Sequence, residues 1–239
     1  MKKKSICVVI PCYKVKDKIY KVVKKINFKI VDHIIVVDDF CPEKSVHFLK
    51  KSLLYKNKIS YIFLKKNLGV GGATIAGFNA AIKKNFKYVI KLDGDGQHEP
   101  KILKTFIKKL EIDKFNCCKG YRELNLFNLK GMPFIRFLGN ISLTLISRVI
   151  SGNFQLKDIT NGLIGIETKI LKKIDLKRIK NNFFFEQDLL FHLVMKKTKI
   201  SQVKVKIIYE NEKSNLKPIK TILPFIVYHL ENLIYRIFR

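Results

Sequence analysis

The hydrophobic pattern of this chain alternates between short apolar runs and segments with apolar residues at helical spacing. Continuous apolar runs without alternation are typical of strands buried on both faces, and helices between them favour a parallel sheet. This α/β pattern predicts strands at 6–10, 33–37, 59–64, 88–92 and 115–119, and helices at 18–25, 45–54, 73–85 and 100–110.

The regular alternation of strands and helices ends after Gly120. The next expected element is a long amphipathic helix at 132–150. We then expect a strand at 161–168, a helix at 185–196, a strand at 203–209 and an apolar, aromatic tail from residue 219. No linker divides the first two hundred residues. We therefore expect one catalytic domain at 1–217, with the 132–150 helix inside it, and a juxtamembrane amphipathic tail at 218–239.

The net charge of the chain indicates which kinds of molecule it attracts. The chain has 48 Lys plus Arg against 19 Asp plus Glu, a net charge of +29, which predicts attraction to nucleic acid, an anionic bilayer or phosphorylated ligands. AT-rich coding explains many of the surface lysines equally well. A hydrophobic content of 47% argues against disorder. The five cysteines lack metal-ligand spacing and indicate reduced thiols, and no apolar run is long enough for a membrane span.

An acidic turn follows the fourth predicted strand. Asp93 and Asp95 are separated by one glycine at a strand end, which is where ligands bind in open α/β sheets. Two carboxylates in such a turn suit Mg²⁺ or Mn²⁺, which keep other positions for water and phosphate oxygens. Gln97 and His98 could add a further ligand or a hydrogen bond. The alternative is an acidic turn that caps the helix beginning near Pro100.

Polar groups follow two other strands, and a glycine-rich turn lies nearby. Asp38 and Asp39 can accept hydrogen bonds from a ribose or a pyrimidine, or else cap the next helix. The turn at 69–72 precedes a predicted helix N-terminus, which favours anions, but it has neither a dinucleotide fingerprint nor a P-loop.

The ordered set of motifs resembles one family, the family 2 inverting glycosyltransferases, and within it the polyprenyl-phosphate branch that includes dolichyl-phosphate mannose synthase. The motifs are Val8-Val9-Ile10-Pro11-Cys12-Tyr13, Val36-Val37-Asp38-Asp39, Asn67-Leu68-Gly69, Leu92-Asp93-Gly94-Asp95-Gly96-Gln97-His98, Lys119-Gly120-Tyr121-Arg122, Asp158-Ile159-Thr160-Asn161-Gly162, Phe184-Phe185-Glu186-Gln187-Asp188 and the loop at 209–217.

The resemblance implies an A-type glycosyltransferase fold: a Rossmann-like nucleotide-binding domain with a mostly parallel mixed sheet and helices on both faces. It also implies the site. The residues expected to bind the donor nucleotide are Pro11, Tyr13, Asp38, Asp39, Gly69, Gly72 and Asp93. The metal ligands would be Asp93, Asp95 and Gln97; the catalytic residues Asp95, Asp158 and Glu186; the acceptor-phosphate contacts Arg122, Arg136, Lys213 and Lys217.

Some positions depart from the family pattern. Phe40-Cys41-Pro42 stands where Gly or Asn followed by Ser is usual, and Lys14 stands where Asn is common, which puts the nucleobase contacts in doubt. Asp-Gly-Asp replaces Asp-Ala-Asp and leaves the metal ligands intact.

The resemblance implies metal-dependent, inverting transfer of a hexose from a nucleotide-diphosphate sugar to a polyprenyl (dolichyl or undecaprenyl) phosphate. The metal neutralises the diphosphate leaving group, and an anionic acceptor makes a strong general base less necessary. Arg122 and Arg136 would position that phosphate. Asp158 would orient the acceptor or an arginine, and it or Glu186 would act as base if the acceptor is an alcohol.

The two amphipathic segments, 132–150 and the tail, predict helices lying on an anionic membrane surface, or ordinary core-facing helices. We expect a peripheral enzyme at the cytoplasmic face of the membrane, or one anchored there by a separate subunit.

Three rival functions use the same features. They are a glycosyltransferase acting on a hydroxyl of a polysaccharide or lipid-linked sugar, a nucleic-acid-binding protein, and a nucleotidyltransferase. Aromatic residues gather in the amphipathic helices instead of along a sheet face, which argues against nucleic acid. The triphosphate loop of a nucleotidyltransferase is missing after Ile10.

Overall fold

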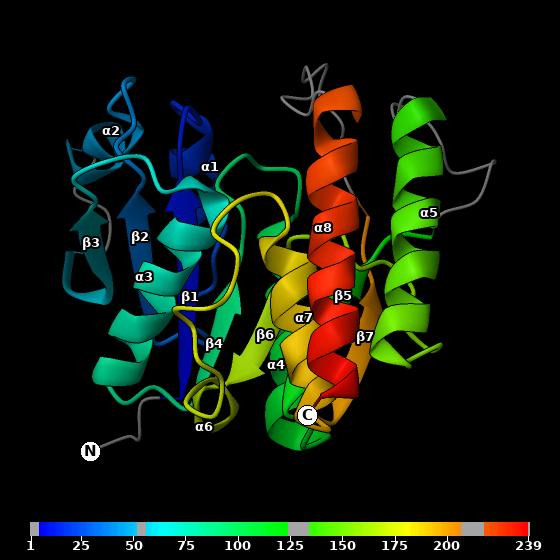
Figure 1. Ribbon diagram of the computed structural model, residues 1–239. Helices are drawn as coiled ribbons and strands as arrows, with labels where there is room; N and C mark the ends of the chain where they lie inside the picture. The colour runs from blue at the N-terminus through cyan, green and yellow to red at the C-terminus, as the bar shows by residue number, and fades with distance from the viewer. Residues whose placement is uncertain (1–4, 52–55, 124–133, 207–217, 239) are drawn as a thin grey trace.

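A computed structural model describes residues 5–51, 56–123, 134–206 and 218–238 of the chain. Its sheet has the strand order β3-β2-β1-β4-β6-β5-β7 (Figure 1). The strands are β1 (Ile6–Cys12), β2 (His33–Asp38), β3 (Ile59–Phe63), β4 (Tyr88–Lys91), β5 (Cys117–Tyr121), β6 (Ile164–Glu167) and β7 (Ile200–Lys204). All neighbours are parallel except β6, which is antiparallel to both β4 and β5. The mixed, mostly parallel sheet predicted from the sequence is confirmed.

Helices connect the strands and cover the sheet. They are α1 (Lys18–Lys24), α2 (Ser45–Lys51), α3 (Gly69–Lys83), α4 (Leu103–Ile107), α5 (Phe134–Ser151), α6 (Thr168–Leu171), α7 (Phe185–Met195) and α8 (Pro218–Ile237). Short turns of other helix types are η1 (Lys56–Lys58), η2 (Pro100–Ile102) and η3 (Lys108–Ile112), the last two extending α4 at its ends.

Most element boundaries match the sequence-based expectations within two residues. The expected end of the 45–54 helix lies outside the described residues, and three elements differ. The helix expected at 73–85 begins at Gly69, so the glycine-rich turn is its first turn. The strand expected at 161–168 is only Ile164–Glu167, and the last strand lies at Ile200–Lys204 instead of 203–209.

Two apolar layers enclose the sheet, as the period-two alternation of a strand requires. In β1, Ile6, Val8 and Ile10 face the layer of α1, α2 and α4, whereas Cys7 and Val9 face the layer of α3, α6 and α7. The helices α5 and α8 lie beside each other next to α7, outside these two layers (Figure 1).

Helix α3 lies so close to the sheet that Gly77 has no room for a side chain. A Cβ atom at this position would lie 2.3 Å from Cγ1 of Val9 and 3.2 Å from Cγ2 of Val37. Both strands end at the site described below, so this contact fixes the distance between the start of α3 and the strand ends.

We predict that Gly77→Ala lowers the free energy of unfolding by about 1–3 kcal/mol, because the added methyl group overpacks the α3–sheet contact. The matched control is Gly139→Ala in α5, where an added Cβ meets nothing within 4 Å. This control should be neutral or stabilising by up to about 1 kcal/mol, since alanine favours a helix. Urea denaturation of both variants measures the difference, and equal effects would contradict the close packing.

Candidate active site

Three parallel strand ends form a cavity of about 300 Å³ at one edge of the sheet. Polar side chains of β1, β2 and β4 meet there with the start of α3. The lining residues are Pro11, Cys12, Tyr13, Val15, Asp39, Asn67, Gly69, Val70, Ala73, Asp93, Gly94 and Asp95. Asp93 and Asp95 thus line the same cavity as the ends of the first two strands.

Most residues predicted to bind the donor nucleotide line this cavity, but two do not. Asp38 is buried, and its Oδ1 accepts a hydrogen bond from the backbone N–H of Cys41 at 2.7 Å, so it holds the turn after β2. Gly72 packs against Leu68, whose Cβ would lie 2.4 Å from an added side chain. Neither residue is among those lining the cavity.

Asp39 is held rigidly at the cavity wall. Its Oδ1 accepts the backbone N–H of Leu68 at 2.7 Å, and its backbone carbonyl accepts Nδ2 of Asn67 at 3.2 Å. Burial raises the pKa of Asp39 and outweighs these hydrogen bonds. The carboxylate therefore comes pre-oriented by the segment that begins α3.

A buried lysine joins Asp93 to Glu186. Lys91 is completely buried, and its Nζ lies 2.7 Å from Oδ1 of Asp93, 2.9 Å from Oε1 of Glu186 and 3.2 Å from the carbonyl oxygen of Gly162. Burial alone would lower the pKa of Lys91, but the two carboxylates outweigh it and raise this pKa. The pKa of Asp93 is lowered in turn, because the nearby ammonium outweighs burial. Both groups are therefore charged.

Gly162 closes the space beside this ion pair. A Cβ atom there would lie 2.3 Å from Oδ2 of Asp93 and 2.8 Å from Nζ of Lys91. Only glycine lets the backbone approach the carboxylate this closely.

Asp158 orients Arg122 through a bidentate ion pair. Its Oδ2 accepts Nε of Arg122 at 2.7 Å and the Arg122 backbone N–H at 3.0 Å, and its Oδ1 accepts Nη2 at 3.0 Å. The Asp158 side chain has no exposed surface. Burial would raise the pKa of Asp158, but the hydrogen-bonded guanidinium outweighs it and lowers this pKa to about 2. The carboxylate is thus engaged with an arginine, one of the two roles the sequence left open.

A second buried lysine lies under the same segment. Nζ of Lys119 donates to the carbonyl oxygens of Asn161 and Gly120. Burial lowers the pKa of Lys119 to about 8. In the sheet register, Lys91 of β4 and Lys119 of β5 both lie opposite Ile164, on the two sides of β6. The two lysines therefore lie in one row across the sheet, and both donate hydrogen bonds to the 158–162 segment.

The donor set at the strand end fits a hard divalent cation. Asp93 and Asp95 offer carboxylate oxygens into one cavity, and such a cation takes its remaining ligands from phosphate and water. Gln97 is placed differently: its backbone N–H donates to Oδ1 of Asp95 at 2.9 Å, and it is not among the residues lining the cavity. No cluster of three or more His, Cys, Asp or Glu side chains suited to a metal occurs in the described residues.

Lys91 and Lys119 were missed as functional residues. Each is a lysine in an otherwise apolar strand, a pattern that does signal a buried charge with partners. Two of their partners, Glu186 for Lys91 and Asn161 for Lys119, lie 95 and 42 positions away along the chain, so only the fold identifies these. Lys213 and Lys217 lie outside the described residues, and so does the side chain of Arg136.

Comparison with known proteins gives the family. Residues 7–174 match glycosyl transferase family 2. The chain is 27% identical to the UDP-N-acetylglucosamine–dolichyl-phosphate N-acetylglucosaminyltransferase of Methanococcus voltae, over 87% of this chain and 88% of that protein. It is 23% identical to polyprenol monophosphomannose synthase of Mycolicibacterium smegmatis, over 78% and 71% of the two chains.

The fold also has solved counterparts. Glucosyl-3-phosphoglycerate synthase of Mycobacterium tuberculosis, crystallised with Mn²⁺, UDP and its product, superposes with a TM-score of 0.67. The match covers 98% of this chain and 80% of that one at 15% identity. This chain therefore has the expected A-type glycosyltransferase fold.

This chain belongs to glycosyl transferase family 2 and is a glycosyltransferase. The family expected from the ordered motifs is confirmed, and its relatives include transferases named for dolichyl and polyprenyl phosphates.

We predict that Lys91→Met destabilises the fold by about 3–5 kcal/mol, because it leaves Asp93 and Glu186 as partly buried carboxylates without their shared cation. Lys104→Met, on the exposed surface of α4, is the control and should change stability by less than about 0.5 kcal/mol. Urea unfolding of both variants tests this. Equal stability of Lys91→Met and wild type would show that the ion pair is unimportant.

A pH dependence follows from Asp158. Because its folded pKa is depressed to about 2, the stabilisation is present above the unfolded pKa and is lost as pH falls through the interval between the two. Asp158→Asn should therefore cost about 2 kcal/mol more at pH 6 than at pH 2. Denaturant midpoints at both pH values measure the cost, and a pH-independent cost would contradict the depressed pKa.

Proposed function

We propose that the protein is a metal-dependent inverting transferase that moves a hexose from a nucleotide-diphosphate sugar to a polyprenyl phosphate at a membrane surface. The observation that carries this proposal is the single cavity in which Asp93 and Asp95 meet Tyr13 and Asp39. A nucleoside fits the β1 and β2 ends of that cavity, and a diphosphate fits its β4 end.

The carboxylate pair accounts for the metal. Asp93 and Asp95 would hold Mg²⁺ or Mn²⁺, which supplies the charge that stabilises the leaving diphosphate. Lys91 keeps Asp93 ionised and holds it in place. The Mn²⁺ and UDP in the mycobacterial synthase of the same fold support this assignment.

The ion pairs favour a phosphate acceptor. Asp158 and Glu186 are the two carboxylates weighed as bases, and each is held by a cation, Arg122 or Lys91. A hydroxyl acceptor would need a base to take its proton, whereas a phosphate is already anionic. Arg122, fixed by Asp158, would bind that phosphate through charge-assisted hydrogen bonds.

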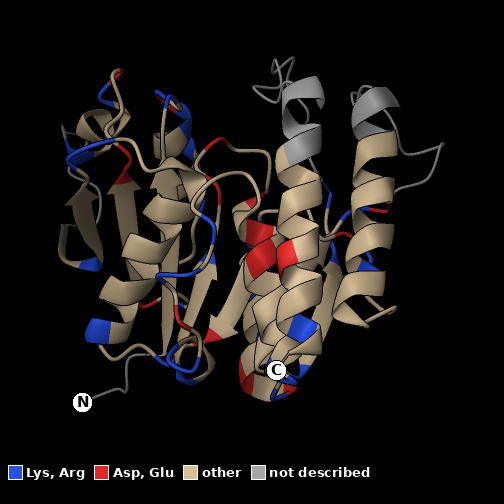
Figure 2. Cartoon of the chain, in the orientation of Figure 1, with Lys and Arg blue, Asp and Glu red and all other residues tan. Residues whose placement is uncertain are grey.

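The helices α5 and α8 support the membrane part of the proposal because their apolar side chains face outward. Their buried side chains are mixed. Ile150 and Tyr228 are apolar or aromatic, Leu143, Phe225 and Tyr235 are partly buried, and the buried polar ones are Asn140, Thr144, Ser151, His229 and Asn232. Outward they expose Leu138, Leu145, Ile146, Val149, Ile226, Val227, Leu230, Leu233, Ile234, Ile237 and Phe238. Figure 2 shows few charged residues on the described parts of either helix.

An apolar outer face suits helices that lie in a lipid interface, where that face is as apolar as its surroundings. Across the described chain, no helix combines the length and the apolarity needed to cross a bilayer. We therefore propose that the pair lies in the membrane plane, with anionic lipid attracting the basic protein.

We expect Asp95→Asn to lower the turnover number about 100-fold or more, because the metal loses a carboxylate ligand. Asp113→Asn is the control, since Asp113 pairs only locally with Lys109 in η3. The assay uses radiolabelled nucleotide-sugar with polyprenyl phosphate or with the dephosphorylated polyprenol. Label transferred only to the alcohol would contradict a phosphate acceptor and support a hydroxyl acceptor. Full activity of Asp95→Asn would contradict the assignment of Asp95 as a metal ligand.

Ile234→Glu should weaken binding to phosphatidylglycerol vesicles at least about tenfold, because it places a charge on the proposed lipid-facing surface. The matched control is Ile112→Glu in η3, at a similarly exposed isoleucine on the layer of α4. Vesicle cosedimentation measures both. Binding unaffected by Ile234→Glu would remove direct membrane contact and favour a separate anchoring subunit.

A further inference from the structure

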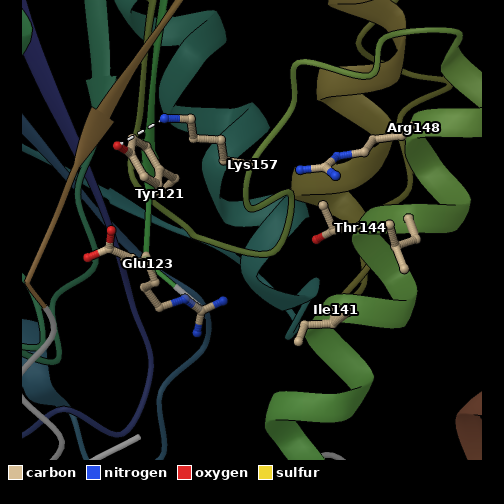
Figure 3. Close-up of a pocket in the computed structure, with 8 residues that line it drawn as sticks. Tyr121, Glu123, Ile141, Thr144, Arg148 and Lys157 are labelled. Atoms are coloured by element: carbon tan, nitrogen blue, oxygen red, sulfur yellow. Dashed lines mark hydrogen bonds between the residues drawn. The ribbon is translucent and has the colours of Figure 1, made fainter. Parts of the chain in front are cut away.

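A second cavity of about 340 Å³ lies between the end of β5 and helix α5 (Figure 3). Its lining residues are Tyr121, Arg122, Glu123, Ile141, Thr144, Leu145, Arg148 and Lys157. Because β6 is antiparallel to both β4 and β5, the ends of β4 and β5 point to the same edge of the sheet. The cavity therefore opens at the edge where the donor cavity lies.

Two cations in this cavity are not neutralised. Arg148 comes from α5, and its Nε donates to the carbonyl oxygen of Leu156. Lys157 comes from the opposite wall, where its Nζ lies 3.2 Å from the hydroxyl of Tyr121 and 4.4 Å from the centre of that ring. Among the described residues, neither forms an ion pair with a carboxylate.

The acidic groups nearby are already paired. Glu123 lines the cavity and forms an ion pair with Lys204, which does not line it. Asp158 forms an ion pair with Arg122. The local field is therefore positive: Arg148 reaches into the cavity from α5, and Lys157, whose amine is turned toward the Tyr121 hydroxyl, lines the opposite wall (Figure 3).

The remaining wall is apolar and leads outward. Ile141 and Leu145 lie one turn apart on α5, and about half of the Leu145 side chain is exposed on the proposed lipid-facing surface. A ligand that satisfies both halves of the cavity carries a phosphate at one end and a hydrocarbon chain at the other.

We propose that this cavity is a subsite for the phosphate head of a lipid. Arg148 and Lys157 bind the phosphate oxygens, and Ile141 and Leu145 contact the first carbons of the chain. Neither cation was among the acceptor contacts expected from the sequence. Where the lipid is the acceptor, this assignment rests on the proposed function; the shared chemistry also fits a bilayer phospholipid.

The subsite also has a structural link to the donor cavity. Arg122 lines the subsite and is held by Asp158, and Gly162, four residues further along, contacts Asp93. A phosphate bound by Arg148 and Lys157 therefore lies in a cavity that Arg122 also lines, and the segment from Asp158 to Gly162 connects this cavity to Asp93 of the donor cavity.

Binding of geranyl phosphate, a short soluble lipid phosphate, tests the subsite by calorimetry on the full chain. Wild type should bind it at least about tenfold more tightly than inorganic phosphate or geraniol, since only the monoester uses both halves. Lys157→Gln and Leu145→Gln should each weaken binding about five- to tenfold. The control is Lys199→Gln, whose lysine lies on the surface over the ring of Phe115 at 4.8 Å and should have no effect.

UDP binding, measured in parallel, shows that each variant keeps its fold. Wild-type affinity for geranyl phosphate in both Lys157→Gln and Leu145→Gln would overturn the proposal. If wild type transfers no sugar to any polyprenyl phosphate yet loses geranyl phosphate binding in these variants, the proposed function fails and the subsite stands. If transfer proceeds with an unchanged acceptor KM and unchanged geranyl phosphate binding, the subsite fails alone.

Two further readouts identify the lipid. A raised acceptor KM in Lys157→Gln, with normal binding to phosphatidylglycerol vesicles, assigns the subsite to the acceptor. Weakened vesicle binding with a normal acceptor KM assigns it to a bilayer phospholipid.

Discussion

The site is organised around one buried ammonium group. Lys91 ends β4, and it draws together Asp93 from the following loop, Glu186 from α7 and the backbone of Gly162. These groups come from three distant parts of the chain, and two of them are carboxylates that would repel each other without the cation. Because a buried charge without a partner is costly, this arrangement stabilises only one relative position of the sheet edge, the 158–162 segment and α7.

A second set of buried charges lies beside the first, next to β5. Lys119 supports the 158–162 segment from the other side of β6, and Asp158 in that segment orients Arg122. A carboxylate and an arginine thus reach the two cavities in fixed orientations, with their charges set by ion pairs instead of by solvent. Preorganised charge of this kind is what a reaction that expels a diphosphate needs, since little reorganisation is left for the transition state.

The sequence predicted well what depends on local pattern. The continuous apolar runs of β1, β2 and β4, each followed by polar residues, were enough to place Tyr13, Asp39, Asp93 and Asp95 at one edge. The start of α3 was missed because Gly69, Gly71 and Gly72 are poor helix formers; the structure tolerates them because Asn181 packs where a side chain at Gly71 would lie. The extents of β6 and β7 depend on pairing with β4 and β5, far away in sequence. Long-range contacts also decide that Asp39 is held at the cavity wall by Leu68, and that Lys91 meets Glu186.

The central claim is that Asp93 and Asp95 bind a divalent cation that in turn binds the donor's diphosphate. The most direct measurement is a calorimetric titration of UDP into the protein with Mn²⁺ and again with a chelator. The account predicts at least about tenfold tighter binding with Mn²⁺, with that gain lost in Asp95→Asn. UDP affinity that is equal with and without the metal would contradict it.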